Sequence, residues 1–94
     1  MANKYLYVVQ AEKSGMLKLG QSTDPEGRTR QMQVGSPERL ILLHKVRLEA
    51  YNQEVLLHRK FRPYRSHGEW YFPNQELLAF VEVMRADPKW WHGL

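Results

Sequence analysis

Two apolar segments near the N-terminus, separated by a short polar stretch, restrict the fold of this chain more than any other feature. Residues 5–9 are Tyr-Leu-Tyr-Val-Val, and this run of aromatic and β-branched side chains favours a buried strand. Residues 16–20, Met-Leu-Lys-Leu-Gly, have the pattern of a second strand, and residues 11–15 between them contain the polar and glycine residues of a turn. Because segments this close in sequence pair readily as a hairpin, the chain is predicted to begin with two antiparallel strands.

A helix is predicted directly after this hairpin. Asp24 can cap it with Pro25 at the first helical position, or Thr23 can cap it with Glu26 three residues further on. Both alternatives start the helix at the same place. Gly35 stands in the usual position after the last turn, so the helix is expected to end just before it.

The remaining elements alternate between apolar strands and amphipathic helices. In the second predicted helix, Ala50, Leu57, Phe61 and Tyr64 fall on one stripe of a helical wheel. The predicted elements are, in chain order, a strand over residues 40–48, a helix over residues 50–62, a short strand over residues 69–72, and a helix from an Asn74 cap to about residue 85.

These elements predict an α/β chain of the α+β kind. The order is strand, strand, helix, strand, helix, short strand, helix, which indicates a small three- to four-stranded, mostly antiparallel sheet flanked by helices. At 94 residues the chain is expected to form one domain over residues 1–94, with a core over about residues 4–86 and an aromatic tail over residues 87–94.

The composition excludes several classes of protein. The chain has no cysteine, which rules out disulfides and thiolate zinc sites and is typical of a reducing compartment. No apolar run approaches the roughly 20 residues of a membrane span, and the N-terminal segment lacks the apolar stretch of a signal peptide, so we expect a cytoplasmic protein without a membrane partner. Lys and Arg number 14 against 10 Asp and Glu, and the resulting charge of +4 permits a polyanionic partner such as nucleic acid.

Several common catalytic motifs are missing. The sequence contains no GxxxxGK[ST] loop, no GxGxxG after a strand and no HExxH. Its histidines are scattered without the spacing of metal ligands, at His44, His58, His67 and His92. The sequence therefore predicts neither a P-loop nucleotide hydrolase nor a zinc enzyme.

A spaced set of groups accompanies the predicted elements: Tyr7 in the first strand, Lys18 and Gly20 in the second, Arg28 in the first helix and Glu54 in the second. With them the chain resembles the GIY-YIG nuclease superfamily, in its small phage-type subgroup of DNA-binding and nuclease domains. The resemblance covers about residues 4–82. The matching pieces occur in the family's order, at residues 5–9, 18–20, 22–28 and 35–37, at Glu54 with His58 and Phe61, and at residues 68–71.

The resemblance implies hydrolysis of phosphodiester bonds with one divalent cation, Mg²⁺ or Mn²⁺. Glu54 matches the glutamate that binds the metal, and such hard cations accept one carboxylate together with waters and phosphate oxygens. Arg28 matches the arginine that binds phosphate, and Tyr7 matches the tyrosine that orients or deprotonates the attacking water. A tyrosine is a poor base at neutral pH unless cations lower its pKa, which is the effect expected of Lys18 and Arg28. His58 is predicted to be a partner of Glu54 or a phosphate donor.

Some positions depart from the family pattern. Lys18 stands where the second motif has a tyrosine, and Tyr5 replaces the glycine of the first motif. A lysine can hold a phosphate but cannot replace a phenol. The family's asparagine has no clear counterpart, and Glu69 and Asn74, which are near its place, are not predicted as ligands. These departures favour an alternative function, a DNA-binding module that has lost catalysis. A small protein-interaction domain is a third alternative.

Residues 58–67 form a second feature, a basic segment interleaved with Phe61 and Tyr64. Its cations are predicted to contact the phosphates of DNA, with RNA as an alternative partner. The other interpretation is a solvated helix end, where cations interact favourably with the helix dipole. The predicted nucleic-acid-binding residues are Lys18, Arg28, Arg30, Arg59, Lys60, Arg62 and Arg65.

The tryptophans are assigned separately. Trp70 is predicted to anchor the core. Trp90 and Trp91 are expected to fold back over the sheet or the last helix. The alternatives for this pair are a stacking platform for unpaired bases and a contact between the subunits of a homodimer.

Overall fold

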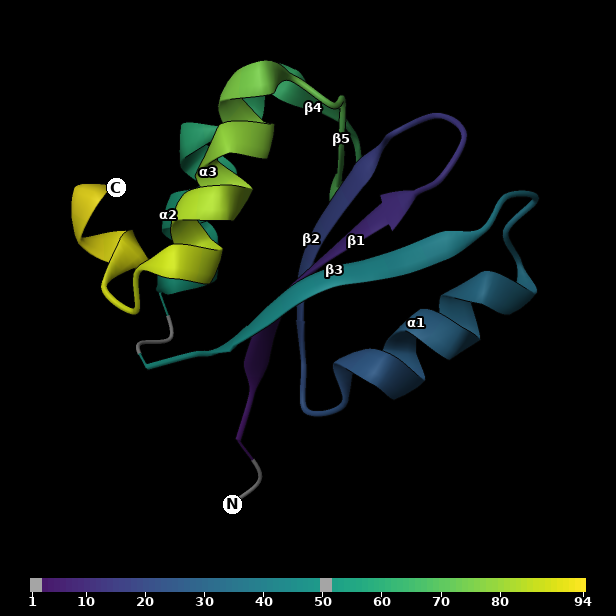
Figure 1. The fold of residues 1–94 in the computed structure, drawn as a ribbon, viewed down its shortest axis with the longest axis horizontal. Coiled ribbons are helices and arrows are strands. Elements are labelled where there is room, and N and C mark those ends of the chain that lie inside the picture. The colour runs from purple at the N-terminus through teal and green to yellow at the C-terminus, as the bar shows by residue number, and fades with distance from the viewer. Residues whose placement is uncertain (1–2, 50–51) are drawn as a thin grey trace.

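The computed structural model describes residues 3–49 and 52–94 and has one sheet with helices on both of its faces (Figure 1). The strand order is β3-β1-β2-β5-β4, and every neighbouring pair is antiparallel. The strands are β1 (Tyr5–Ala11), β2 (Leu17–Ser22), β3 (Leu40–Arg47), β4 (Arg65–His67) and β5 (Trp70–Tyr71). The α-helices are α1 (Pro25–Val34), α2 (Gln53–Lys60) and α3 (Gln75–Ala86), and the 3₁₀ turns are η1 (Arg62–Tyr64) and η2 (Trp90–Gly93).

The α+β fold class is confirmed, but the sheet has five strands where the sequence predicts three to four. The additional strand is β4, inside the basic segment, and all of its residues are exposed. No apolar alternation marks it. It forms because Gly68, with a φ of 54°, turns the chain so that β4 pairs with β5.

The two faces of the sheet carry separate cores. Side chains of β1 alternate between them, so that Leu6 and Val8 belong to one cluster and Tyr7 and Val9 to the other. The first cluster also contains Leu57 of α2 and is completed by apolar residues of the sheet, α3 and the C-terminal turn, namely Leu17, Leu19, Phe61, Tyr71, Leu77, Val81, Met84 and Trp90.

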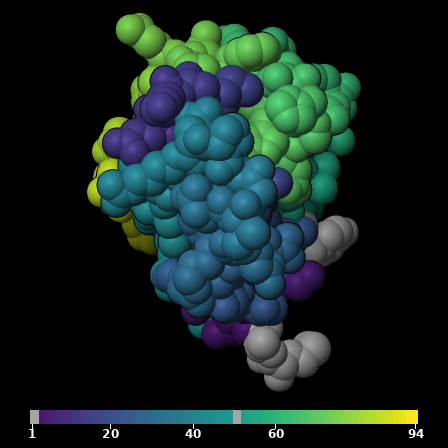
Figure 2. Space-filling model, turned by 90° about the vertical axis from the view of Figure 1, so that its right-hand side faces the viewer, coloured from purple at the N-terminus to yellow at the C-terminus, as the bar shows by residue number. Residues whose placement is uncertain are grey.

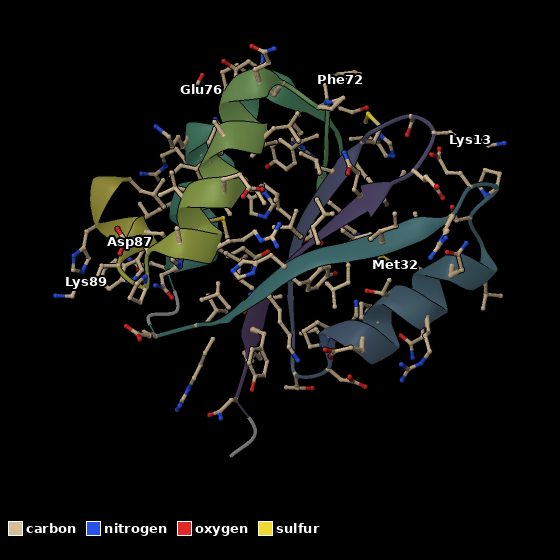
Figure 3. All side chains as sticks on the ribbon, in the orientation of Figure 1. Lys13, Met32, Phe72, Glu76, Asp87 and Lys89 are labelled. Atoms are coloured by element: carbon tan, nitrogen blue, oxygen red, sulfur yellow. The ribbon has the colours of Figure 1, made fainter. Side chains whose placement is uncertain are left out.

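Helix α1 covers the second face. It is a polar helix in which only Pro25 is buried, and Met32 packs against the cluster of Tyr7, Val9 and Leu40 from the helix side (Figure 3). Such a helix is held by few apolar contacts, so its position depends largely on its two ends.

The structure decides between the two caps that the sequence leaves open at α1. The carboxylate of Asp24 accepts a hydrogen bond of 3.1 Å from the Gly27 N–H, with Pro25 in the first turn. At the start of α3, Asn74 caps as predicted and accepts from the Glu76 N–H at 2.7 Å. Helix α2 begins later than predicted, and Ala50 of its predicted stripe lies outside the described residues.

The C-terminal tail folds back, as the sequence predicts. Trp90 is 3% exposed and meets Phe80 of α3 edge-to-face, with ring centroids 6.0 Å apart. Trp91 is partly buried against the same core. Because Trp90 is buried, its ring has no free face on which a base could stack. The homodimer stays a prediction, and the two tryptophans suggested as its contact pack within the chain instead. Among the helices of the described residues, none is both long and apolar enough to cross a bilayer.

Candidate metal centre and phosphate cleft

Strand β5 is so short that the site forms at the edge of β2 just beyond it. β5 pairs only with Leu17 and Lys18 of β2. The next residue, Leu19, donates its N–H to the carbonyl of Glu69 at 3.1 Å, which brings the residue preceding β5 against this edge. The edge is therefore approached by side chains from α2 and from the β4–β5 turn at the same time.

Tyr7 reaches this edge because its partner in the β1–β2 register is Gly20. A Cβ atom on Gly20 would lie 2.6 Å from the Tyr7 hydroxyl oxygen and 2.8 Å from Cζ. The ring of Tyr7, which is 1% exposed, thus lies across the bare backbone of Gly20. Any larger residue at position 20 would displace the hydroxyl.

Three potential metal ligands meet at the same edge: Glu54 in α2, His58 one turn later, and Glu69. The Nε2 atom of His58 lies 3.2 Å from Oε1 of Glu54, and its Nδ1 contacts the Tyr71 hydroxyl. One ligand atom from each of the three residues lies within 4.8 Å of the others. Glu54 is only 7% exposed, so protein groups such as His58, rather than water, surround its carboxylate.

The two carboxyl groups have opposite shifts. The hydrogen bond from His58 lowers the pKa of Glu54, and this effect outweighs the opposing effect of burial. Burial raises the pKa of Glu69, and the hydrogen bond and charge repulsion with Glu54 raise it further. The positive charge of Lys18, whose Nζ lies 3.6 Å from Oε1 of Glu69, has the opposite effect and lowers this pKa. The hydrogen bond between the two carboxyl groups requires a proton, and a divalent cation that displaced this proton would gain two negatively charged ligands.

The electrostatics of Tyr7 differ from the expectation. Burial raises its pKa most, and the charges of Glu69 and Glu54 raise it further, whereas only Arg28 lowers it. Arg28 thus acts in the predicted direction, but burial and the two carboxylates outweigh it, so the prediction that Lys18 and Arg28 give Tyr7 a lowered pKa is wrong in its net result. Tyr7 therefore keeps its proton at neutral pH, which argues against a role as a general base.

A cleft of about 430 Å³ opens in front of these ligands. Arg59, Arg62 and Arg65 of the basic segment line it, and all three are exposed. The remaining lining residues are Glu54, Val55, His58, Gly68, Glu69 and Tyr71. Cations at the rim and carboxylates at the base are suited to a phosphate that is bound through a metal ion.

Two of the predicted binding residues lie elsewhere. Lys60 points toward α3, with its Nζ 5.7 Å from the ring centroid of Phe61 and 6.0 Å from that of Phe80. Arg30 is an exposed residue of α1, where it interacts with the charge of Glu26. The structure thus gathers Glu54, His58, Arg59, Arg62 and Arg65 around one cleft, and Lys18 joins them through its ion pair with Glu69. Tyr7 feels the charges of both glutamates and of Arg28, whereas Lys60 and Arg30 lie outside this group.

Sequence reasoning did not select Glu69. The signal was present, because residues 68–71 are one of the segments that match the GIY-YIG pattern. A carboxylate that follows a glycine and precedes a two-residue strand has no periodicity that indicates burial. Its place beside Glu54 follows only from the pairing of β5 with β2.

The donor set fits a divalent cation. Two carboxylates and one imidazole are ligands that Mn²⁺ accepts readily, and carboxylates with waters are the usual ligands of Mg²⁺. One ligand atom of each residue lies within 4.8 Å of the others, a spacing that one ion can join.

The family model of the T5orf172 domain matches residues 4–86 of this chain. The chain belongs to the T5orf172 domain family. T5orf172 domains are phage-associated and of a nuclease-related type. No curated protein and no solved structure matches the chain. The T5orf172 match extends from β1 through α3 and includes every residue of the metal centre and the cleft, whereas Trp90 and Trp91 lie beyond it.

Proposed function

We propose that this T5orf172 domain is a divalent-metal-dependent endonuclease of the GIY-YIG type that hydrolyses phosphodiester bonds of DNA. The observation that carries the proposal is the convergence of Glu54, His58 and Glu69 at one end of an arginine-lined cleft, beside Tyr7. Glu54 and His58 come from α2 and Glu69 comes from the turn before β5, and neither core uses the carboxylates. A site that only stabilised the fold would not need two carboxylates whose charges oppose each other.

Glu54 and Glu69 would hold Mg²⁺ or Mn²⁺, with His58 as a third ligand or as the group that orients Glu54. Bound there, the cation would polarise a phosphate oxygen and offset the negative charge that develops during hydrolysis. Burial raises the pKa of Tyr71, so its hydroxyl keeps its proton. It can donate to Nδ1 of His58 when the Nε2–H orients Glu54, or accept from Nδ1–H when Nε2 binds the metal, and in both cases it fixes the orientation of the imidazole.

The cationic residues would bind and position the DNA. Arg59, Arg62 and Arg65 line the cleft in front of the carboxylates and can donate to the phosphates flanking the scissile bond. Arg28 acts on the same charged cluster from the α1 side, since it lowers the pKa of Tyr7. Tyr7 would hydrogen-bond and orient the attacking water, and Lys18 would hold a phosphate oxygen beside Glu69.

Metal binding and cleavage should be measured on the same variants. Manganese affinity can be followed by isothermal titration, and nicking of supercoiled DNA can be followed with Mg²⁺, Mn²⁺ or EDTA. We expect Glu54→Gln and Glu69→Gln to lose more than about 100-fold in metal affinity and in nicking rate. The matched control is Glu82→Gln, an exposed carboxylate of α3 whose partner is Arg85, and it should retain both properties. Nicking that survives in Glu54→Gln would refute the assignment.

A DNA-binding module without catalysis is the second candidate. It is favoured by Lys18, which replaces the family's second tyrosine and is engaged in an ion pair with Glu69. In that case wild type would bind DNA with a steep dependence on salt concentration, because several phosphate contacts release counterions, but no metal would support nicking. Parallel titrations with RNA of the same sequence would distinguish the two nucleic acids.

A further inference from the structure

A second groove lies on the α1 face of the sheet, on the other side of β5 from the metal centre. It consists of two adjoining hollows of about 280 and 520 Å³, which share Ser36, Pro37, Leu40, His67 and Trp70. One wall is the connection from α1 to β3, and the other is the β4–β5 hairpin. In Figure 2 the blue atoms of α1 and the green atoms around β4 and β5 border one another on this face.

We propose that this groove binds one unpaired nucleobase of the same nucleic acid strand whose phosphate lies at the metal centre. The proposal rests on the proposed function for the location of that phosphate. It adds a base-binding subsite, which makes an unstacked or single-stranded region the preferred substrate.

The groove has the flat apolar surfaces that a base requires. Trp70 packs against the core cluster of Tyr7, Val9, Ala11 and Leu40, yet it is only partly buried and lines both hollows. The sequence-based prediction of Trp70 as a core anchor is therefore only half right. An indole fixed from behind by the core gives a stacking surface at little cost in side-chain entropy.

The groove also has the right charge. Lys18 pairs with Trp70 across the β2–β5 ladder, and its Nζ lies 5.7 Å from the indole centroid. Among the described residues that line the two hollows, the one carboxylate is Glu38, and it accepts hydrogen bonds from the Lys13 and Ser14 N–H groups at 2.8 and 2.9 Å. Glu38 is thus engaged with the β1–β2 turn, and the groove presents a cation to its ligand.

Lys18 joins the groove to the metal centre. The same Nζ that lies near Trp70 is 3.6 Å from Oε1 of Glu69. A nucleotide whose phosphate contacts Lys18 at the metal centre would therefore have the groove within reach of its own or the adjacent base. A base in a duplex is stacked on both sides and cannot enter such a hollow, so the base must be unpaired.

Binding to the full chain in EDTA tests the subsite separately from catalysis. Fluorescence anisotropy can compare a labelled single-stranded oligonucleotide, the same strand with abasic sites, and the duplex. We expect Trp70→Leu to weaken binding of the intact single strand by roughly 5- to 150-fold, the range that loss of one stacked base produces. Affinity for the abasic strand and the duplex should change less than about twofold, and Trp70→Phe should restore most of the lost affinity.

Two controls keep the result interpretable. His67→Ala removes an exposed ring from the groove without affecting the core, so it should weaken single-strand binding even if Trp70→Leu folds poorly. A 2-aminopurine placed in the strand should be quenched by wild type and less by Trp70→Leu.

Equal losses on single strand, abasic strand and duplex, or no loss with either variant, would overturn the proposal. If the Trp70 effect is found but no metal supports nicking, the proposed function fails while the subsite stands. If nicking is found without the Trp70 effect, the base-binding subsite fails while the proposed function stands.

Discussion

Replacing Gly20 by alanine would place a methyl group against the ring of Tyr7. The new Cβ would lie 2.6 Å from the hydroxyl oxygen, roughly 0.8 Å closer than an ordinary contact of 3.4 Å. Tyr7 is 1% exposed and its ring packs in the core cluster with Val9, Ala11 and Leu40, so it cannot move aside without displacing them. Overpacking of this kind lowers the free energy of unfolding by about 1–3 kcal/mol. For a domain of this size, each kcal/mol lowers Tm by about 4–8 °C.

The same change should reduce catalysis more than stability explains. Displacing a positioning group by about 1 Å can lower a rate by about 100-fold. Urea denaturation would give the free energy of unfolding, and DNA nicking at a temperature where both proteins are folded would give the rate. The matched control is Gly35→Ala, since a Cβ atom at Gly35 meets nothing within 4 Å. That variant should stay within about 0.5 kcal/mol of wild type.

A double-mutant cycle identifies the cause. In a Tyr7→Leu background the hydroxyl and Cζ are gone, so the cost of Gly20→Ala should fall to within about 0.5 kcal/mol. If Gly20→Ala costs the same in both backgrounds, or costs no more than Gly35→Ala, then the close approach of Tyr7 to Gly20 does not constrain position 20, and the explanation given for this glycine is wrong.

Three further predictions concern stability. Burial and the nearby charge of Arg85 lower the pKa of His44, and the charge of Glu82 offsets only part of this effect. The folded state therefore prefers the neutral imidazole. Unfolding free energy should therefore fall as pH drops below about 6.5, and His44→Gln should flatten this part of the urea-derived profile. Asn74→Ala should cost about 1 kcal/mol by removing the cap of α3, measured by the same denaturation. Trp90→Ala should cost about 3–5 kcal/mol, because the indole is buried against Phe80 and α3; a loss below about 1 kcal/mol would show that the tail does not pack as described.

Local signals in the sequence predicted most of the fold. The caps at Asp24 and Asn74 and the stop at Gly35 act within a few residues of themselves, so the bounds of α1 and α3 can be predicted without tertiary information. β4 could not be predicted in this way, because all of its residues are exposed and it forms by pairing with β5, which follows it in the chain.

In the candidate site, too, some residues could be predicted from local sequence patterns and others depend on tertiary contacts. Tyr7, Arg28 and Glu54 were selected through the family pattern, and the structure places them around one charged cluster. Glu69 was missed as a candidate ligand because its proximity to Glu54 depends on how far β5 extends along β2. The raised pKa of Tyr7 was also missed, since the sequence gives no measure of burial and does not show that two carboxylates face the phenol.

The shortness of β5 has a consequence for the timing of assembly at the site. Glu69 is carried by a hairpin that joins the sheet through the Leu17–Tyr71 and Lys18–Trp70 pairs and the hydrogen bond from the Leu19 N–H to the Glu69 carbonyl, whereas β1 is paired with β2 over residues 5–10 and with β3 over residues 5–11. Local opening of residues 65–71 should therefore require far less free energy than opening of β1, and the backbone amides of this hairpin should exchange with solvent well before those of β1. A divalent cation that joins Glu54 to Glu69 would link the hairpin to α2. Metal binding and ordering of the hairpin would then be one event, seen as slower hydrogen exchange over residues 65–71 and unchanged exchange in β1.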